Sequence, residues 1–152
     1  MKKLILISAL LLFASNGWAY NETDLIKLKA LNACEGCDLS GVNLTEANLS
    51  YAKLSYAKLS IANLRHANLY DADLNNANLY DADLYRANLS NAKLEGADLN
   101  GANLSEANLS NATLSGIDLT TANLRDANLD DAKFCKTKMP WGELNDDCEN
   151  AD

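Results

Sequence analysis

The chain has 152 residues, the size of one domain, with 13 Lys and Arg against 21 Asp and Glu and a formal net charge of −8. An acidic surface of this size disfavours nucleic-acid phosphates and anionic lipids as ligands. Apolar residues make up 48% of the chain but aromatic residues only 7%. This bias toward Leu and Ala is the first indication of a repetitive sequence.

The first nineteen residues have the three parts of a secretory signal. Two lysines follow the initiating Met, residues 4–13 are mainly apolar, and the small residues Gly17 and Ala19 come next. The apolar run is about half the length that a bilayer span needs, which argues against a membrane anchor. We therefore expect residues 1–19 to be a signal peptide that is cleaved after Ala19. Cleavage removes two lysines and no acid, so the net charge changes from −8 to −10.

Residues 20–36 are predicted to cover the first coil of the structure that follows. Thr23 and Asp24 have the character of a helix N-terminus. The apolar residues that come after them are Leu25, Ile26, Leu28 and Leu31. The sequence thus predicts a short N-terminal capping helix.

The central part of the chain repeats every five residues. Leu stands at every fifth position from Leu39 to Leu129, and Phe134 and Met139 continue the series. Ala precedes most of these residues by two positions, with Asn or Asp between them. An α-helix would scatter the leucines around its circumference, and a flat strand would send alternate ones to opposite faces. A chain that bends once every five residues buries them all.

Four such sides close a square coil, so that each Leu stacks on the Leu of the next coil about 4.8 Å away. The sequence therefore predicts an all-β solenoid with a core of Leu and Ala. Representative predicted core residues are Leu79, Leu84, Leu89 and Leu94.

With this pattern, residues 37–139 resemble the pentapeptide-repeat family. The resemblance implies a right-handed quadrilateral β-helix, here of about five coils. Some cytoplasmic members of that family are similar to DNA in width, charge and rod shape, and bind type II topoisomerases to block or protect them. After the repeat, Pro140 and Trp141 break the pattern, so residues 140–152 are predicted to be a C-terminal cap or tail, with Trp141 over the last coil.

The four cysteines divide between the two ends of the predicted rod. A disulfide needs Cα atoms within about 7 Å, and five coils separate the two pairs. We expect the local disulfides Cys34–Cys37 and Cys135–Cys148, which suit an exported protein. The same separation argues against a zinc site with four thiols. A redox-active Cys-x-x-Cys is disfavoured because a solenoid side, and not a helix, follows the first cysteine.

Residues twenty apart in the chain are expected to stack in columns on the outer surface. One column is predicted to be an amide ladder that holds the register. It consists of Asn48, Asn68, Asn88, Asn108 and Asn128.

Two surface groups are candidate binding sites. Arg65, His66, Tyr85 and Arg86 form a basic and aromatic cluster suited to an anionic or carboxylate group, with salt bridges to Glu46 and Glu106 as the alternative. The second group is an aromatic patch at exposed bends, consisting of Tyr51, Tyr56 and Tyr70.

This sequence lacks residues suited to catalysis. The single histidine is expected on an outer bend, the interior leaves no room for a cofactor, and no phosphate loop or metal-spaced cluster is present. We expect no enzyme activity, no cofactor and no metal. The leading hypothesis is a rigid scaffold or protein-interaction module, exported to the periplasm, the extracellular space or a thylakoid lumen. The alternative is a DNA-mimicking binder of a type II topoisomerase.

Overall fold

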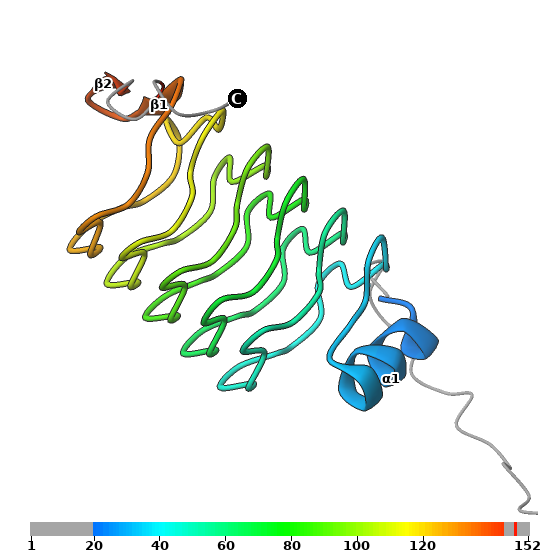
Figure 1. Cartoon of the computed structure of the whole chain (residues 1–152). Coiled ribbons are helices and arrows are strands. Elements are labelled where there is room, and N and C mark those ends of the chain that lie inside the picture. The colour runs from blue at the N-terminus through cyan, green and yellow to red at the C-terminus, as the bar shows by residue number, and fades with distance from the viewer. Residues whose placement is uncertain (1–19, 145–147, 149–152) are drawn as a thin grey trace, which may run out of the picture.

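The computed structural model describes residues 20–144 and residue 148. The chain begins with the helix α1 (Glu22–Leu31) and ends with an antiparallel hairpin of β1 (Thr137–Met139) and β2 (Gly142–Leu144). Between them it winds into a stack of coils, with α1 at one end of the stack and the hairpin at the other (Figure 1).

Each coil has four sides of five residues, because residues twenty positions apart lie side by side. Parallel bridges join such pairs, for example Asn63 to Asp83, and the series runs from Ala33 to Lys138. The amides of most central leucines donate to a carbonyl of the next coil, as Leu64 does to Asp83 at 2.8 Å. Backbone hydrogen bonds along the rod thus satisfy the polar groups of the sides.

The sides are isolated bridges and not strands. Because the chain bends every five residues, one residue per side has a partner in the parallel ladder. Within the described residues, only β1 and β2 are strands. The predicted all-β solenoid is therefore built mainly from bends and single bridges.

The interior is a stack of leucines with alanines beside them. Every central Leu from Leu54 to Leu119 has no exposed surface, and this range includes Leu79, Leu84, Leu89 and Leu94. Burial of this kind stabilises a fold by roughly 1.5–3 kcal/mol per side chain. The stacked core fixes the backbone and so fixes the directions of the outer side chains.

Within residues 36–136, every bend except the one at Thr121 places one residue in the left-handed backbone region. This residue is the second after the central Leu, and its φ is 60° at Tyr51, 58° at Ile61 and 71° at Gly101. The Asn or Asp before the Leu supports the bend, because its side-chain oxygen accepts from the amide two residues on, as Asn88 does from Ser90 at 3.1 Å. The second bend residue therefore projects outward at the corners, whereas the first is mostly half-buried.

α1 begins earlier than the sequence predicted. Its N-cap is Asn21, whose side chain accepts from the Thr23 amide at 3.0 Å, so Thr23 lies inside the helix. Leu28 is buried in the common core, but Ile26 and Leu31 are each 67% exposed. The expectation that the whole apolar series covers the first coil is therefore wrong for Ile26 and Leu31.

The C-terminal hairpin is anchored through β1. Thr137 is buried and its hydroxyl donates to the Leu114 carbonyl at 2.7 Å, while Met139 is also buried. Pro140 and Trp141 form the connection to β2, and Trp141 is 63% exposed. The expectation that Trp141 covers the last coil is wrong, because the tight turn directs it outward. No helix in the described part of the chain is long and apolar enough to cross a membrane.

Candidate interaction surface

Among the described residues, the interior of the coils consists mainly of Leu and Ala. An open groove of about 440 Å³ lies between α1 and the first coil. Its lining is Leu28, Lys29, Asn32, Leu44, Ala47, Asn48, Leu49 and Ser50. Lys29 is the ionisable member of this set, so the groove lacks the paired acid and base that general catalysis needs.

Side-chain amides form a ladder on one outer side, as the sequence predicts. The Asn68 amide donates to the Asn48 side-chain oxygen at 3.5 Å, Asn88 to Asn68 at 3.2 Å, and Asn108 to Asn88 at 3.5 Å. Parallel bridges continue the column to Asn128. These amides hold the register of the coils and are engaged with one another, which makes this side a poor candidate for binding.

The structure brings Arg65, His66, Tyr85 and Arg86 together at one corner. The guanidinium carbons of Arg65 and Arg86 lie 4.4 and 5.0 Å from the centre of the Tyr85 ring. The His66 ring meets the Tyr85 ring edge-on, with centroids 5.5 Å apart. Tyr85 is thus the centre of the cluster, with both cations within cation–π distance.

Each arginine of this cluster is already paired with a carboxylate of the chain. Arg65 pairs with Asp83 at 2.9 Å, and Arg86 pairs with Glu106 at 2.7 Å. The Tyr85 hydroxyl also donates to Glu106 at 3.1 Å. The hydrogen bond from Arg86 lowers the pKa of Glu106 below its usual value. Binding of an external anion here stays a prediction, and such an anion competes with two internal carboxylates.

One of the expected partners differs from the sequence prediction. Arg86 pairs with Glu106 as expected, but Arg65 pairs with Asp83. Glu46, the other expected partner, forms no ion pair within residues 20–144. Asp83 lies at the bridged position of the next coil, whereas Glu46 lies at a bend. A search limited to bend columns could not find Asp83.

The aromatic patch is brought together only in part. The rings of Tyr51 and Tyr70 meet edge-on with centroids 5.5 Å apart. Tyr56 occupies the next corner, and among the described residues it has no ring contact with either. Tyr51 and Tyr56 are nevertheless 62% and 66% exposed, far more than is usual for a large ring.

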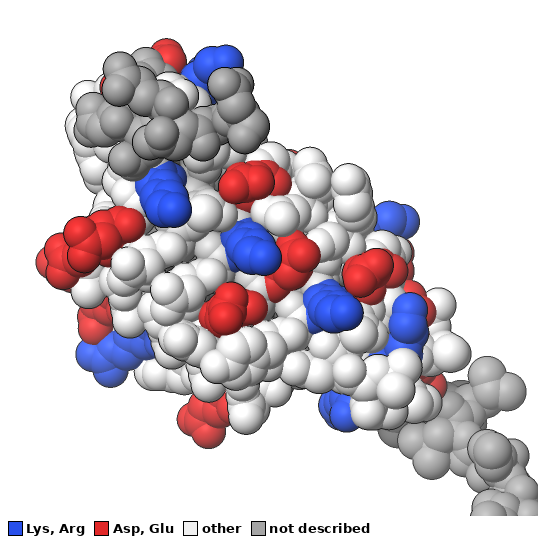
Figure 2. Space-filling model, viewed as in Figure 1, with Lys and Arg blue, Asp and Glu red and all other residues white. Residues whose placement is uncertain are grey.

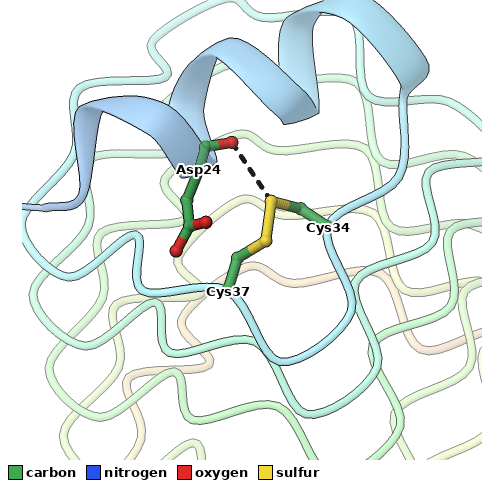
Figure 3. A group of neighbouring side chains, drawn as sticks. All are labelled: Asp24, Cys34 and Cys37. Carbon is green, nitrogen blue, oxygen red and sulfur yellow. Dashed lines mark hydrogen bonds between the residues drawn. A yellow bond between two sulfur atoms is a disulfide. The ribbon is translucent and has the colours of Figure 1, made fainter.

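The structure pairs the same cysteines that the sequence pairs. The Cα atoms are 5.2 Å apart in Cys34–Cys37 and 4.9 Å apart in Cys135–Cys148. The first disulfide is buried beneath α1, and the Cys34 sulfur contacts the Asp24 backbone oxygen at 3.1 Å (Figure 3).

The Asp24 side chain and these two sulfurs lie within 4.8 Å of one another, as a metal site requires. Both sulfurs are in a disulfide, however, and a metal needs thiolates. The Asp24 carboxylate instead accepts from the Asp38 amide at 2.8 Å. This group therefore fastens α1 to the first coil.

A family model of pentapeptide repeats matches residues 33–60, 62–101 and 102–139 with eight copies. The chain belongs to the pentapeptide-repeat family. Proteins of this family fold as right-handed quadrilateral β-helices and are in general non-catalytic structural or interaction modules. The resemblance stated from the sequence is confirmed.

Several solved structures of pentapeptide-repeat proteins are similar to this chain. HetL from the cyanobacterium Nostoc sp. strain PCC 7120, involved in heterocyst differentiation regulation, is 37% identical over 74% of this chain, with a TM-score of 0.68. The match covers 53% of HetL, so the chain spans about half the length of that protein. A comparison with curated proteins finds no match.

Two further structures are more distant. A pentapeptide repeat protein from the Arabidopsis thaliana thylakoid lumen is 32% identical over 76% of this chain and 70% of its own, with a TM-score of 0.46. QnrB1, a plasmid-mediated fluoroquinolone resistance protein, is 23% identical over 70% of this chain and 57% of its own, with a TM-score of 0.41.

Proposed function

We propose that this pentapeptide-repeat protein is an exported, non-catalytic rod that binds another protein through its outer surface. The observation that carries the proposal is the division of the molecule into a filled core and a fixed surface. The central leucines from Leu54 to Leu119 have no exposed surface, while Tyr51 and Tyr56 project from a hydrogen-bonded backbone. Large rings on a rigid scaffold lose little entropy on binding.

The proposed rod has about five coils, since the bridges run from residue 33 to residue 138 at twenty residues per coil. In this proposal α1 caps the N-terminal end. Leu28 enters the core there, and the Asn32 side chain donates to the Ser50 carbonyl at 2.8 Å. A cap of this kind shields the unpaired backbone of a terminal coil.

Export is supported by the signal sequence and by the cysteines. The signal lies outside the described residues, so its support comes from its composition alone. Both cysteine pairs are oxidised, which is typical of proteins in the periplasm, outside the cell or in an oxidising lumen.

The second candidate is a DNA-mimicking binder of a type II topoisomerase. The net charge of −8 and the rod shape favour it. However, acidic and basic side chains are mixed on the face shown in Figure 2, whereas a mimic of the DNA backbone needs a continuous negative surface. Purified protein added to a supercoiling assay separates the two candidates, because the exported rod leaves the topoisomerase unaffected.

Site-specific photocrosslinking in expressing cells tests the proposed function. A photoreactive residue replaces, one at a time, the corner residues Tyr51, Tyr56, Ile61 and His66 of an early coil and Asn111, Gly116, Thr121 and Asp126 of a late coil. We expect a discrete protein adduct from neighbouring corners and none from the opposite corners. The absence of any protein adduct at all eight positions would overturn the proposal.

A further inference from the structure

One turn of the solenoid differs in charge from its other turns. Residues 47–70, which we call the girdle, contain Lys53, Lys58, Arg65 and His66 and no Asp or Glu. The whole chain has 13 basic and 21 acidic residues, so 10 basic and 21 acidic residues lie outside the girdle. Since twenty residues make one coil, the girdle encircles an otherwise acidic rod once.

Large side chains project from three successive corners of the girdle. Tyr51, Tyr56 and Ile61 are 62%, 66% and 41% exposed. All three have left-handed backbone conformations, with φ of 60°, 60° and 58°. One coil further on, the same corners hold Asp71, Asn76 and Asp81. Asn, Asp and Gly adopt this conformation at lower cost than an aromatic or β-branched residue. Folding therefore does not explain these three side chains.

Lysines alternate with these corners around the girdle. Lys53 lies on the side between Tyr51 and Tyr56, and Lys58 on the side between Tyr56 and Ile61. Within residues 20–144, the Lys53 ammonium has no carboxylate within 4 Å. The Lys58 ammonium is 3.6 Å from Asp38, and its side chain remains 62% exposed. Both cations are open to a partner.

The surface is convex and rigid. The Tyr51 ring rests edge-on against Tyr70, and Lys53 is bridged to Ala33 on one side and to Asp73 on the other. Projecting rings on a convex corner fit pockets of a folded protein better than they fit a linear sugar chain, which needs a groove or a flat platform. Tyr is also among the residues that carry most of the binding energy at protein interfaces.

We propose that the girdle is a docking surface for an acidic protein surface that has apolar pockets. The inference rests on the proposed function, and it adds the location of the contact and the chemistry of the partner. The lysines attract the acidic groups at long range, and Tyr51 and Tyr56, which lie on neighbouring corners, enter the pockets.

Immobilised acidic polymers test this proposal. The probes are poly-glutamate, a glutamate–tyrosine copolymer and polygalacturonate, and binding of the full chain is measured by interferometry at low and high salt. We expect salt-sensitive binding to both polypeptides, tighter for the copolymer. Lys53→Ser/Lys58→Ser should weaken binding tenfold or more, and Lys53→Ser alone should weaken it less. Tyr51→Ser/Tyr56→Ser should remove the advantage of the copolymer.

The matched control is Lys93→Ser/Lys133→Ser, on the same side as Lys53 in later coils, and it should change binding less than twofold. Equal losses in the control and girdle variants, or no binding to either polypeptide, would overturn the proposal. Binding to polygalacturonate alone would overturn it in favour of a glycan. Crosslinks confined to the late coil would leave the proposed function standing while removing the girdle as its site.

Discussion

At the residue scale, the stability of the rod comes from leucines that pack against the leucines at the same position in the neighbouring coils. Leu84 has no exposed surface and lies between Leu64 and Leu104, which are also fully buried. Each side chain therefore fills space that the coils above and below have left for it. Because neighbouring coils share every contact, a cavity in one side affects two interfaces.

Leu84→Ala is expected to lower the free energy of unfolding by about 2–5 kcal/mol, through lost burial and the cavity that remains. Leu31→Ala is the matched control, because Leu31 is 67% exposed, and its effect should stay within about 0.5 kcal/mol. Denaturant unfolding followed by circular dichroism measures both. Equal losses in the two variants would contradict the stacked core.

The glycines carried a signal about the bends that the sequence analysis did not use. Gly36, Gly96 and Gly116 stand at the second position after the central residue, and each has a positive φ. Their shared phase indicates that this position favours the left-handed region, which it adopts at every bend from 36 to 136 except at Thr121. Tyr51 and Ile61 share the phase, so their strained backbone was predictable, whereas the ring contact of Tyr51 with Tyr70 depends on side-chain rotamers.

At the element scale, α1 is held to the solenoid by a few polar contacts. The Asn21 amide donates to the Asp38 carbonyl at 2.9 Å, and the Asp24 carboxylate accepts from the Asp38 amide at 2.8 Å. Leu28 adds the main apolar contact. The helix was predictable from its apolar series, but its N-cap at Asn21 and the face that packs were not.

Asp24→Ala is expected to loosen α1 without unfolding the coils. The substitution leaves the Asp38 amide without its acceptor, which costs about 1–3 kcal/mol where the amide is shielded from water. Hydrogen exchange should quicken in α1 and stay unchanged at Leu84. Glu22→Ala removes an exposed acid from the same first turn and should leave exchange at Asp38 unchanged. Uniform quickening through the rod would contradict local docking.

Outer columns form a second kind of element, and the pair of Arg86 and Glu106 gives it a pH dependence. The pKa of Glu106 is lowered in the folded chain, chiefly by the hydrogen bond from Arg86. A lowered pKa contributes stability above the unfolded pKa of about 4.3, and this stability is lost as the pH falls through the folded pKa.

A double-mutant cycle of Arg86→Gln and Glu106→Gln measures this coupling by denaturant unfolding at several pH values. We expect a favourable coupling at pH 7 that declines below about pH 4.3. The pair is solvent-exposed, so high salt should reduce the coupling at neutral pH. A coupling that is independent of pH would show that the contact is not ionic.

At the scale of the whole molecule, the five-residue period determines the architecture because every side has to bury its central Leu and the Ala two positions before it. The buried residues from Leu54 to Leu119 and the amide column from Asn48 follow from counting along the chain. The ends follow no period, and Trp141 and Ile26 were accordingly misplaced. The pairing of Arg65 with Asp83 depends on where long side chains reach, which a linear period does not encode.

We propose that the chain acts outside the cytoplasm as a binding rod. Fractionation of expressing cells, with N-terminal sequencing of the recovered protein, tests it most directly. We expect a mature chain that starts at Tyr20, is found outside the cytoplasm and has both disulfides formed. An intact chain that starts at Met1 and stays in the cytoplasm with reduced cysteines would contradict it, and would favour the topoisomerase-binding alternative.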